Sequence, residues 1–184
     1  RSFSINPFSL PKTKENLQFL FSFVKVLVSS SGYTPSMEDD QDLWIQIESM
    51  YDIDAGHRRL STLASIVRRP MAQALTKWVG DGQYGTLFDN IEDNLTFATF
   101  QAFDFEGMHN FPEMLEPLLF CVLHRASEVI TGPDLASTLK VFVMDEAWRF
   151  FRLGMRTVLQ SQFVEFYRRA ALIWRRHSKA RWRP

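Results

Sequence analysis

One stretch, residues 140–146, constrains the fold of this chain more than any other. Residues 141–144 are four apolar residues in a row, which is typical of a buried strand. Asp145 and Glu146 follow directly, and residues 147–151 open a helical pattern. A buried strand that ends in acids favours a parallel α/β sheet, in which ligands bind at the carboxyl ends of the strands.

The two acids match the Walker B pattern of nucleoside triphosphatases. Asp145 would hold Mg²⁺ through water, because Mg²⁺ keeps most of its hydration shell in proteins. Glu146 would orient or deprotonate the water that attacks ATP. The motif alone is not specific, because many apolar strands end in an acid.

The elements before this strand support an α/β fold. Residues 95–97 and 100–105 read as strands, and Pro112 begins a helix with a wide apolar face, which gives a strand–helix–strand order. Further upstream, the apolar spacing predicts one strand and four helices, at residues 2–5, 17–28, 36–50, 60–67 and 70–78. We therefore predict a mostly parallel sheet with flanking helices.

Composition indicates a globular protein and limits its partners. The chain has 184 residues, of which 46% are hydrophobic, and no apolar run approaches the length of a membrane span. The formal net charge is zero, so no global field favours nucleic acid or an anionic membrane. The single cysteine, Cys121, cannot form an internal disulfide, which favours a reducing compartment.

Positive charge is concentrated at the end of the chain. From Arg149 onward there are ten arginine and lysine residues and one acid, Glu165. Aromatic and apolar residues in this region keep helical spacing: Phe163, Phe166, Tyr167, Ala170, Ala171 and Trp174. We predict a basic helical tail, which is either a solvated face or a contact for phosphate or acidic lipid.

Other candidate sites are weaker. Residues 80–85 spell G-x-G-x-x-G, but a dinucleotide fingerprint needs a strand before it and a helix after it. A helical pattern precedes these glycines and residues 86–90 do not look helical, so we predict a glycine-rich turn. Cys121 is expected to be a buried core cysteine. The histidines have no metal-ligand spacing: His57, His109, His124 and His177.

Six segments carry a family resemblance through their order and spacing: residues 5–10, 78–85, 87–90, 103–107, 123–125 and 143–149. Together they resemble the conjugal-transfer ATPases of type IV secretion systems, in the branch of TrbE and CagE. The similarity runs from about Ile5 to Arg152. The individual segments are loose, and it is their combination that is specific.

The resemblance implies a RecA-like P-loop NTPase motor that uses Mg²⁺ and ATP to assemble a pilus or move substrate. It implies a homo-oligomer, a hexamer in the full-length protein, docked with other secretion subunits on the cytoplasmic face of a bacterial inner membrane. Asp145 and Glu146 match the Walker B pair of the family. Glu106 would end the neighbouring strand, and nothing identifies Arg125 as an arginine finger.

The chain departs from the family pattern at two places. No G-x-x-x-x-G-K-[ST] loop occurs, so we expect the chain to begin after the Walker A loop and to be inactive alone. Beyond Arg152 the sequence stays helical and basic, where the family would continue to another core strand. We therefore predict a partial motor domain over residues 1–152 and a divergent tail over residues 153–184.

Two alternatives remain open. In the first, the chain is a non-catalytic interaction module, in which Asp145 and Glu146 are a degenerate remnant or a helix cap. In the second, it is a fragment of a DNA-pumping translocase, which the basic tail supports through nucleic-acid binding. A salt-dependent affinity for DNA would distinguish the translocase.

Overall fold

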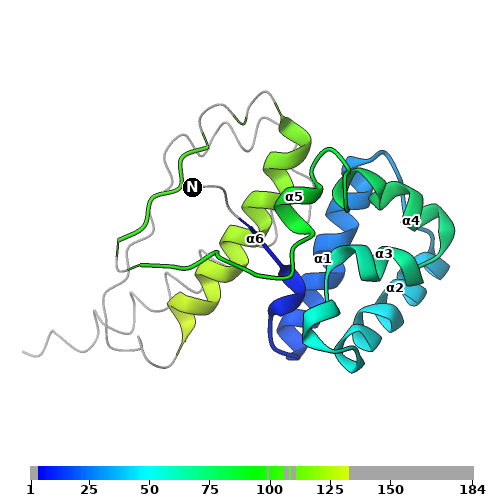
Figure 1. Ribbon diagram of the computed structural model, residues 1–184, viewed down its shortest axis with the longest axis horizontal. Helices are drawn as coiled ribbons and strands as arrows, with labels where there is room; N and C mark the ends of the chain where they lie inside the picture. Colours follow the sequence, from blue (N-terminus) through cyan, green and yellow to red (C-terminus); the bar gives the residue numbers. More distant parts are fainter. Residues whose placement is uncertain (1–3, 99, 106–107, 109–110, 133–184) are drawn as a thin grey trace, which may run out of the picture. The chain divides into compact units, whose positions relative to one another are not determined.

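The computed structural model describes residues 4–98, 100–105, 108 and 111–132. The chain divides into two units, Arg1–Cys121 and Val122–Pro184, and most of the described residues belong to the first. The described residues form helices joined by loops (Figure 1). The helices are η1 (Pro7–Ser9), α1 (Lys14–Ser30), α2 (Met37–Ser49), η2 (Met50–Asp52), η3 (Ala55–His57), α3 (Leu60–Ile66), α4 (Arg69–Leu75), η4 (Thr76–Trp78), α5 (Gly85–Phe88) and α6 (Pro112–Thr131).

The prediction of a mostly parallel, RecA-like sheet is wrong, because the part of the chain that the structure describes is helical and contains no strand. The strands predicted at residues 95–97 and 100–105 have no regular secondary structure there. The same holds for residues 4–5, the described part of the strand predicted at residues 2–5. A strand needs a ladder of backbone partners. The amide of Ser4 instead donates to a side chain, that of Asn94. The strand predicted at residues 141–144 and the tail at 153–184 lie outside the described residues.

The four predicted upstream helices are confirmed as α1, α2, α3 and the pair α4–η4. Their ends follow ordinary capping rules. The Thr13 hydroxyl accepts a hydrogen bond from the amide of Asn16 at the start of α1. At the start of α2, Ser36 and Asp39 form the reciprocal capping box that their spacing predicted.

Helix α1 lies at the centre of the first unit and contacts both α2 and α4. Five of its side chains are fully buried: Leu20, Phe23, Val24, Leu27 and Val28. Phe23 meets Phe88 edge to face with ring centroids 5.3 Å apart, and Phe19 stacks on Phe120 of α6 at 5.3 Å. Because burial of each large apolar side chain contributes about 1.5–3 kcal/mol, this helix supplies much of the stability of the unit.

Trp78 connects the end of α1 to the loop that follows η4. Its indole Nε1 donates to the carbonyl oxygen of Leu27 and to the hydroxyl of Ser31, each at 3.1 Å. Its ring packs against Tyr84 and Phe88, with centroids 4.8 and 5.9 Å away. This buried side chain therefore satisfies a carbonyl at the C-terminus of α1 and fills the core beside it.

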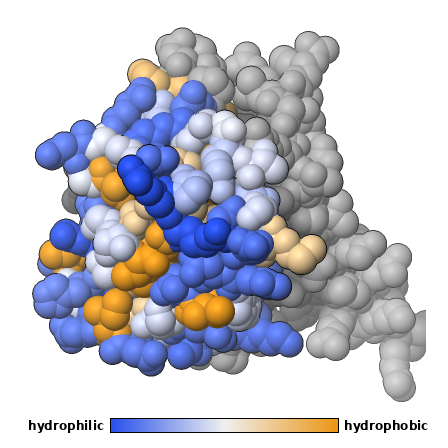
Figure 2. Space-filling model, turned by 90° about the vertical axis from the view of Figure 1, so that its right-hand side faces the viewer, coloured by the Kyte–Doolittle hydropathy of each residue, from blue (hydrophilic) through white to orange (hydrophobic). Residues whose placement is uncertain are grey.

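Apolar patches interrupt a mostly hydrophilic surface on the side of the unit that carries α2, α3 and α4 (Figure 2). Large exposed apolar side chains on α2 include Met37 and Ile45. Within the described ranges, no helix is both long and apolar enough to cross a membrane.

Replacement of Trp78 tests its role at the end of α1. Trp78→Phe keeps an aromatic ring but removes the donor to Leu27 and leaves space in the core. We expect the free energy of unfolding to fall by about 2–4 kcal/mol. Urea denaturation followed by circular dichroism measures this. The matched control is Trp44→Phe, at a half-buried position on α2, which should cost less than about 1 kcal/mol. Equal losses in both variants would contradict the role given to the indole donor.

Candidate functional site

The predicted catalytic residues, Asp145 and Glu146, lie outside the described residues, as does Glu106. The Walker B assignment therefore stays a prediction. Arg125 lies on α6 and is half-buried. Cys121, on the same helix, is buried, as predicted for a core cysteine.

The glycine-rich segment is a turn, as predicted, between η4 and α5. Gly80 has φ +52°, a backbone conformation that favours glycine. The expectation that the next residues are not helical was wrong, because Gly85–Phe88 form the short helix α5. Phe88 is fully buried, so tertiary packing rather than local propensity holds this turn of helix in place.

The glycines of this turn are required by close packing. A Cβ on Gly82 would overlap the carbonyl oxygen of Thr76, and one on Gly85 would overlap the carbonyl oxygen of Gly80. The amides of the turn donate inside the protein: Gly82 to Val79 at 2.9 Å, and Gly85 to Gly82 at 3.0 Å. A phosphate-binding loop needs amides that point at its ligand, so this turn is built for packing.

Residues 4–6 lie beside residues 87–94, and we call this contact the clasp. Its central residue is Asn6, which is only 1% exposed. The Asn6 Nδ2 group donates to the carbonyl oxygens of Arg58 and Ile91, each at 3.0 Å, and its Oδ1 accepts from the amide of Phe8 at 3.1 Å. A buried amide side chain with three such partners fixes the path of every segment that it contacts.

Two further residues extend the clasp. The Asn90 Nδ2 group donates to the carbonyl oxygens of Ile5 and Leu87, at 3.2 and 3.0 Å. The Asp89 carboxylate accepts from the amide of Ser61, at the start of α3, and from the amide of Gly80, both at 2.8 Å. One carboxylate thus joins a helix N-terminus to the glycine-rich turn.

Three of the six segments that carry the family resemblance meet at the clasp: residues 5–10, 78–85 and 87–90. The side chains of Asn6, Asp89 and Asn90 form hydrogen bonds with backbone groups of the same unit. The structural roles of Asn6, Asp89 and Asn90 were not predicted from the sequence. The available signal was the placement of Asn and Asp beside proline and glycine turns, where such side chains bond to the backbone.

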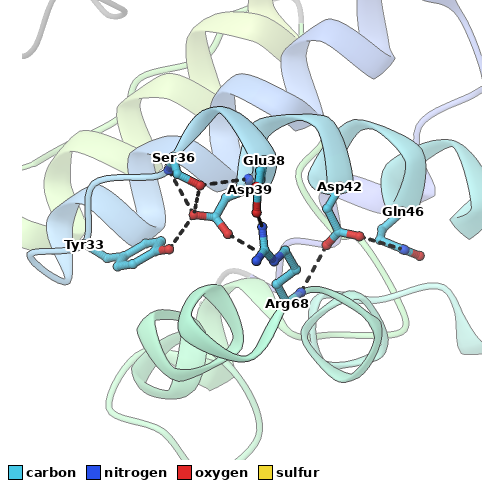
Figure 3. A network of polar contacts seen from close by, with 7 residues as sticks. All are labelled: Tyr33, Ser36, Glu38, Asp39, Asp42, Gln46 and Arg68. Atoms are coloured by element: carbon cyan, nitrogen blue, oxygen red, sulfur yellow. Dashed lines mark hydrogen bonds and ion pairs between the residues drawn. The ribbon is translucent and has the colours of Figure 1, made fainter.

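A second polar network joins the α1–α2 loop to the start of α4 (Figure 3). The Asp39 carboxylate accepts from the Tyr33 hydroxyl at 2.6 Å and from the amide of Ser36 at 2.9 Å. Arg68 pairs with Glu38, with Nη1 2.6 Å from Oε2, and its Nε lies 3.7 Å from Asp39 Oδ1. The Asp42 carboxylate accepts from the backbone amide of Arg68 at 3.1 Å.

This network shifts the proton affinities of its members. The Tyr33 hydroxyl and the Ser36 amide lower the pKa of Asp39, because both hydrogen bonds favour the ionised carboxylate. The same hydrogen bond to Asp39 raises the pKa of Tyr33. The acidic run at the start of α2 is therefore a capped helix N-terminus, as the sequence indicated. In the part of the chain that is described, no three His, Cys, Asp or Glu residues are grouped to hold a metal ion.

Substitution of Gly85 tests the packing interpretation of the turn. Gly85→Ala should lower the free energy of unfolding by about 2 kcal/mol or more, because its Cβ would meet backbone. The control is Gly56→Ala, where the nearest atom to the new Cβ is a side-chain oxygen of Asp54 at 3.3 Å. Chemical denaturation of both variants provides the measurement, and a Gly85→Ala variant as stable as wild type would contradict the interpretation.

The acid dependence of stability tests the Asp39 network. Because folding lowers the pKa of Asp39 below its ordinary value of 3.8, its contribution is present above that pH. The contribution is lost as the pH falls through the lower folded-state pKa. Asp39→Asn should cost about 1–2 kcal/mol at neutral pH, the usual loss for a helix cap. The difference from wild type should shrink below about pH 4.

The control for this variant is Glu48→Gln, which removes one charge from the exposed side of α2 and should change stability by less than about 0.5 kcal/mol. Denaturation curves at a series of pH values compare the two variants. A loss in Asp39→Asn that does not vary with pH would show that the Asp39 charge contributes nothing.

Comparison with known proteins confirms the predicted resemblance to proteins of type IV secretion systems. The chain is 27% identical to the type IV secretion system protein virB4 of Bartonella henselae over 142 residues, which is 74% of this chain and 18% of the relative. It is 28% identical to virB4 of Brucella abortus over 162 residues, which is 79% of this chain and 19% of the relative. No family model matches the chain.

A third relative is the type IV secretion system protein PtlC of Bordetella pertussis, which is 29% identical over 160 residues, with the same shares of 79% and 19%. The match with virB4 of Bartonella henselae covers 74% of the 184 residues of this chain. A match of that length includes the stretch from α3 to α6 whichever end of the chain it leaves out. Helices α3, α4, α5 and most or all of α6 therefore belong to the matched region. The chain spans about a fifth of the length of these curated relatives, to which it is similar in sequence.

Proposed function

We propose that this chain is part of an ATP-hydrolysing subunit of a type IV secretion system. The observation that carries the proposal is the similarity over about three quarters of the chain to several proteins that are named as type IV secretion system proteins. The Asp-Glu pair after the apolar run at residues 141–144 supports the use of ATP.

The chemistry of the proposed site rests on Asp145 and Glu146. Carboxylate oxygens are the donors that Mg²⁺ prefers, so the residue types fit a magnesium–nucleotide complex. Asp145 would hold the ion through water and thereby bind the nucleotide. Bound Mg²⁺ would neutralise charge on the transferred phosphoryl group. Glu146 would orient the attacking water and accept its proton.

The proposal includes partners and a place in the cell. The subunit would act as a homo-oligomer, a hexamer when complete, with other secretion-system subunits on the cytoplasmic face of a bacterial inner membrane. The described helices would serve this machine as a structural unit, because the polar residues of the clasp bond to their own backbone. A role as an interaction module has support from the same observation.

ATP turnover tests the proposal. In the complete gene product that carries this sequence, Glu146→Gln should keep ATP binding and lower the rate of hydrolysis by about 100-fold or more, because it removes the proton acceptor. Asp145→Asn should weaken Mg²⁺-dependent nucleotide binding. Equilibrium nucleotide binding and phosphate release measure the two effects.

The matched control is Glu165→Gln, which removes the one acid that follows Arg149 and should leave turnover unchanged. If wild type binds and hydrolyses ATP and Glu146→Gln turns over at the wild-type rate, the role given to Glu146 is wrong. If wild type neither binds nor hydrolyses ATP, the ATPase proposal fails and the interaction module takes its place. Salt-dependent binding of DNA would favour a DNA-pumping translocase.

A further inference from the structure

A shallow apolar groove lies along the exposed side of α2. It is lined by Phe21 of α1 and by five residues of α2: Met37, Asp40, Gln41, Trp44 and Ile45. Met37 is 79% exposed and Ile45 is 60% exposed. Phe21 and Trp44 meet edge to face with ring centroids 5.7 Å apart and form one wall. Large apolar side chains that gather in this way mark an interaction surface more strongly than isolated ones do.

The surroundings of the groove are acidic. Helix α2 carries five acids and no base: Glu38, Asp39, Asp40, Asp42 and Glu48. Two cations from other segments pair with them, Lys25 with Asp40 at 2.6 Å and Arg68 with Glu38 at 2.6 Å. Asp39 is buried, so the remaining negative charge on the surface of α2 comes from Asp42 and Glu48. Helical spacing puts Glu48 one turn beyond Trp44, on the side of the groove. The other oxygen of Asp40, Oδ1, is buried with no hydrogen-bond donor among the described residues.

The sequence of the same chain contains the complementary chemistry. Residues 149–184 carry ten arginine and lysine residues against one acid, together with aromatic residues at helical spacing. We infer that the groove of one copy binds residues 149–184 of a second copy of this chain. Apolar side chains of that segment would cover Met37 and Ile45, and its arginines would pair with the acids of α2.

This contact joins two different surfaces, so each copy offers one groove and one basic segment. Such contacts build rings or open chains, or a two-fold dimer when two copies exchange their basic segments. The zero net charge of the chain arises because acidic and basic parts cancel, and their attraction between copies is screened by salt. The inference goes beyond the proposed function and does not require ATP binding.

Sedimentation of the full chain without nucleotide, over a series of protein and salt concentrations, tests the inference. We expect reversible self-association that weakens as salt is raised. Ile45→Glu should raise the dissociation constant about tenfold or more, because it places a charge where apolar surface is covered. The matched control, Ile91→Glu, changes a side chain that is 56% exposed outside the groove and should associate like wild type.

A second variant makes the test specific for the basic segment. Replacement of four of its arginines by glutamine should abolish self-association: Arg168, Arg169, Arg175 and Arg176. A mixture of this variant with Ile45→Glu should form a complex again, because the first keeps the groove and the second keeps the basic segment. Circular dichroism confirms that both variants fold.

Three results would each overturn the inference. They are a wild-type chain that stays monomeric at low salt, an Ile45→Glu variant that associates like wild type, and a mixture of the two variants that forms no complex. Because no nucleotide is present, none of these results bears on the proposed ATPase activity.

Discussion

The buried side chain of Asn6 is the interaction on which the arrangement of the helical unit depends. It holds the start of the described chain against Arg58 and Ile91, two points that lie far away in sequence. A buried amide must find partners for its donors, so these contacts admit one path of the chain and exclude others. With that path fixed, Phe88 reaches the core beside Phe23 and Trp78, where apolar burial supplies the stability.

Sequence alone was sufficient for features that are decided locally. The spacing of apolar residues located α1, α2, α3 and α4, and the Ser36–Asp39 spacing located a capping box. The glycine-rich turn followed from its glycines, although the short helix α5 after it did not. That helix depends on burial of Phe88 against residues distant in sequence, which no local pattern reveals.

The wrong and missing predictions have the same physical origin as the missed helix α5, because they too depend on contacts between residues distant in sequence. An alternating or apolar run such as residues 100–105 becomes a strand only when a partner strand satisfies its backbone, and that partner is a long-range choice. Asn6 and Asp89 were missed because a buried polar residue looks like a surface residue until its partners are known. The Asp145–Glu146 pair came from a motif and a resemblance, and its position lies beyond the described residues.

The clasp also bears on how such a protein changes over evolutionary time. Because residues 4–6 and 87–94 lie side by side, everything between them leaves and returns to nearly the same point. The clasp therefore closes residues 7–86 into one loop whose two ends lie side by side. The entropy of closing a loop grows only with the logarithm of its length. Insertions in exposed loops between residues 7 and 86 should therefore cost little, as long as Arg58, Ser61 and Gly80 keep their contacts with the clasp.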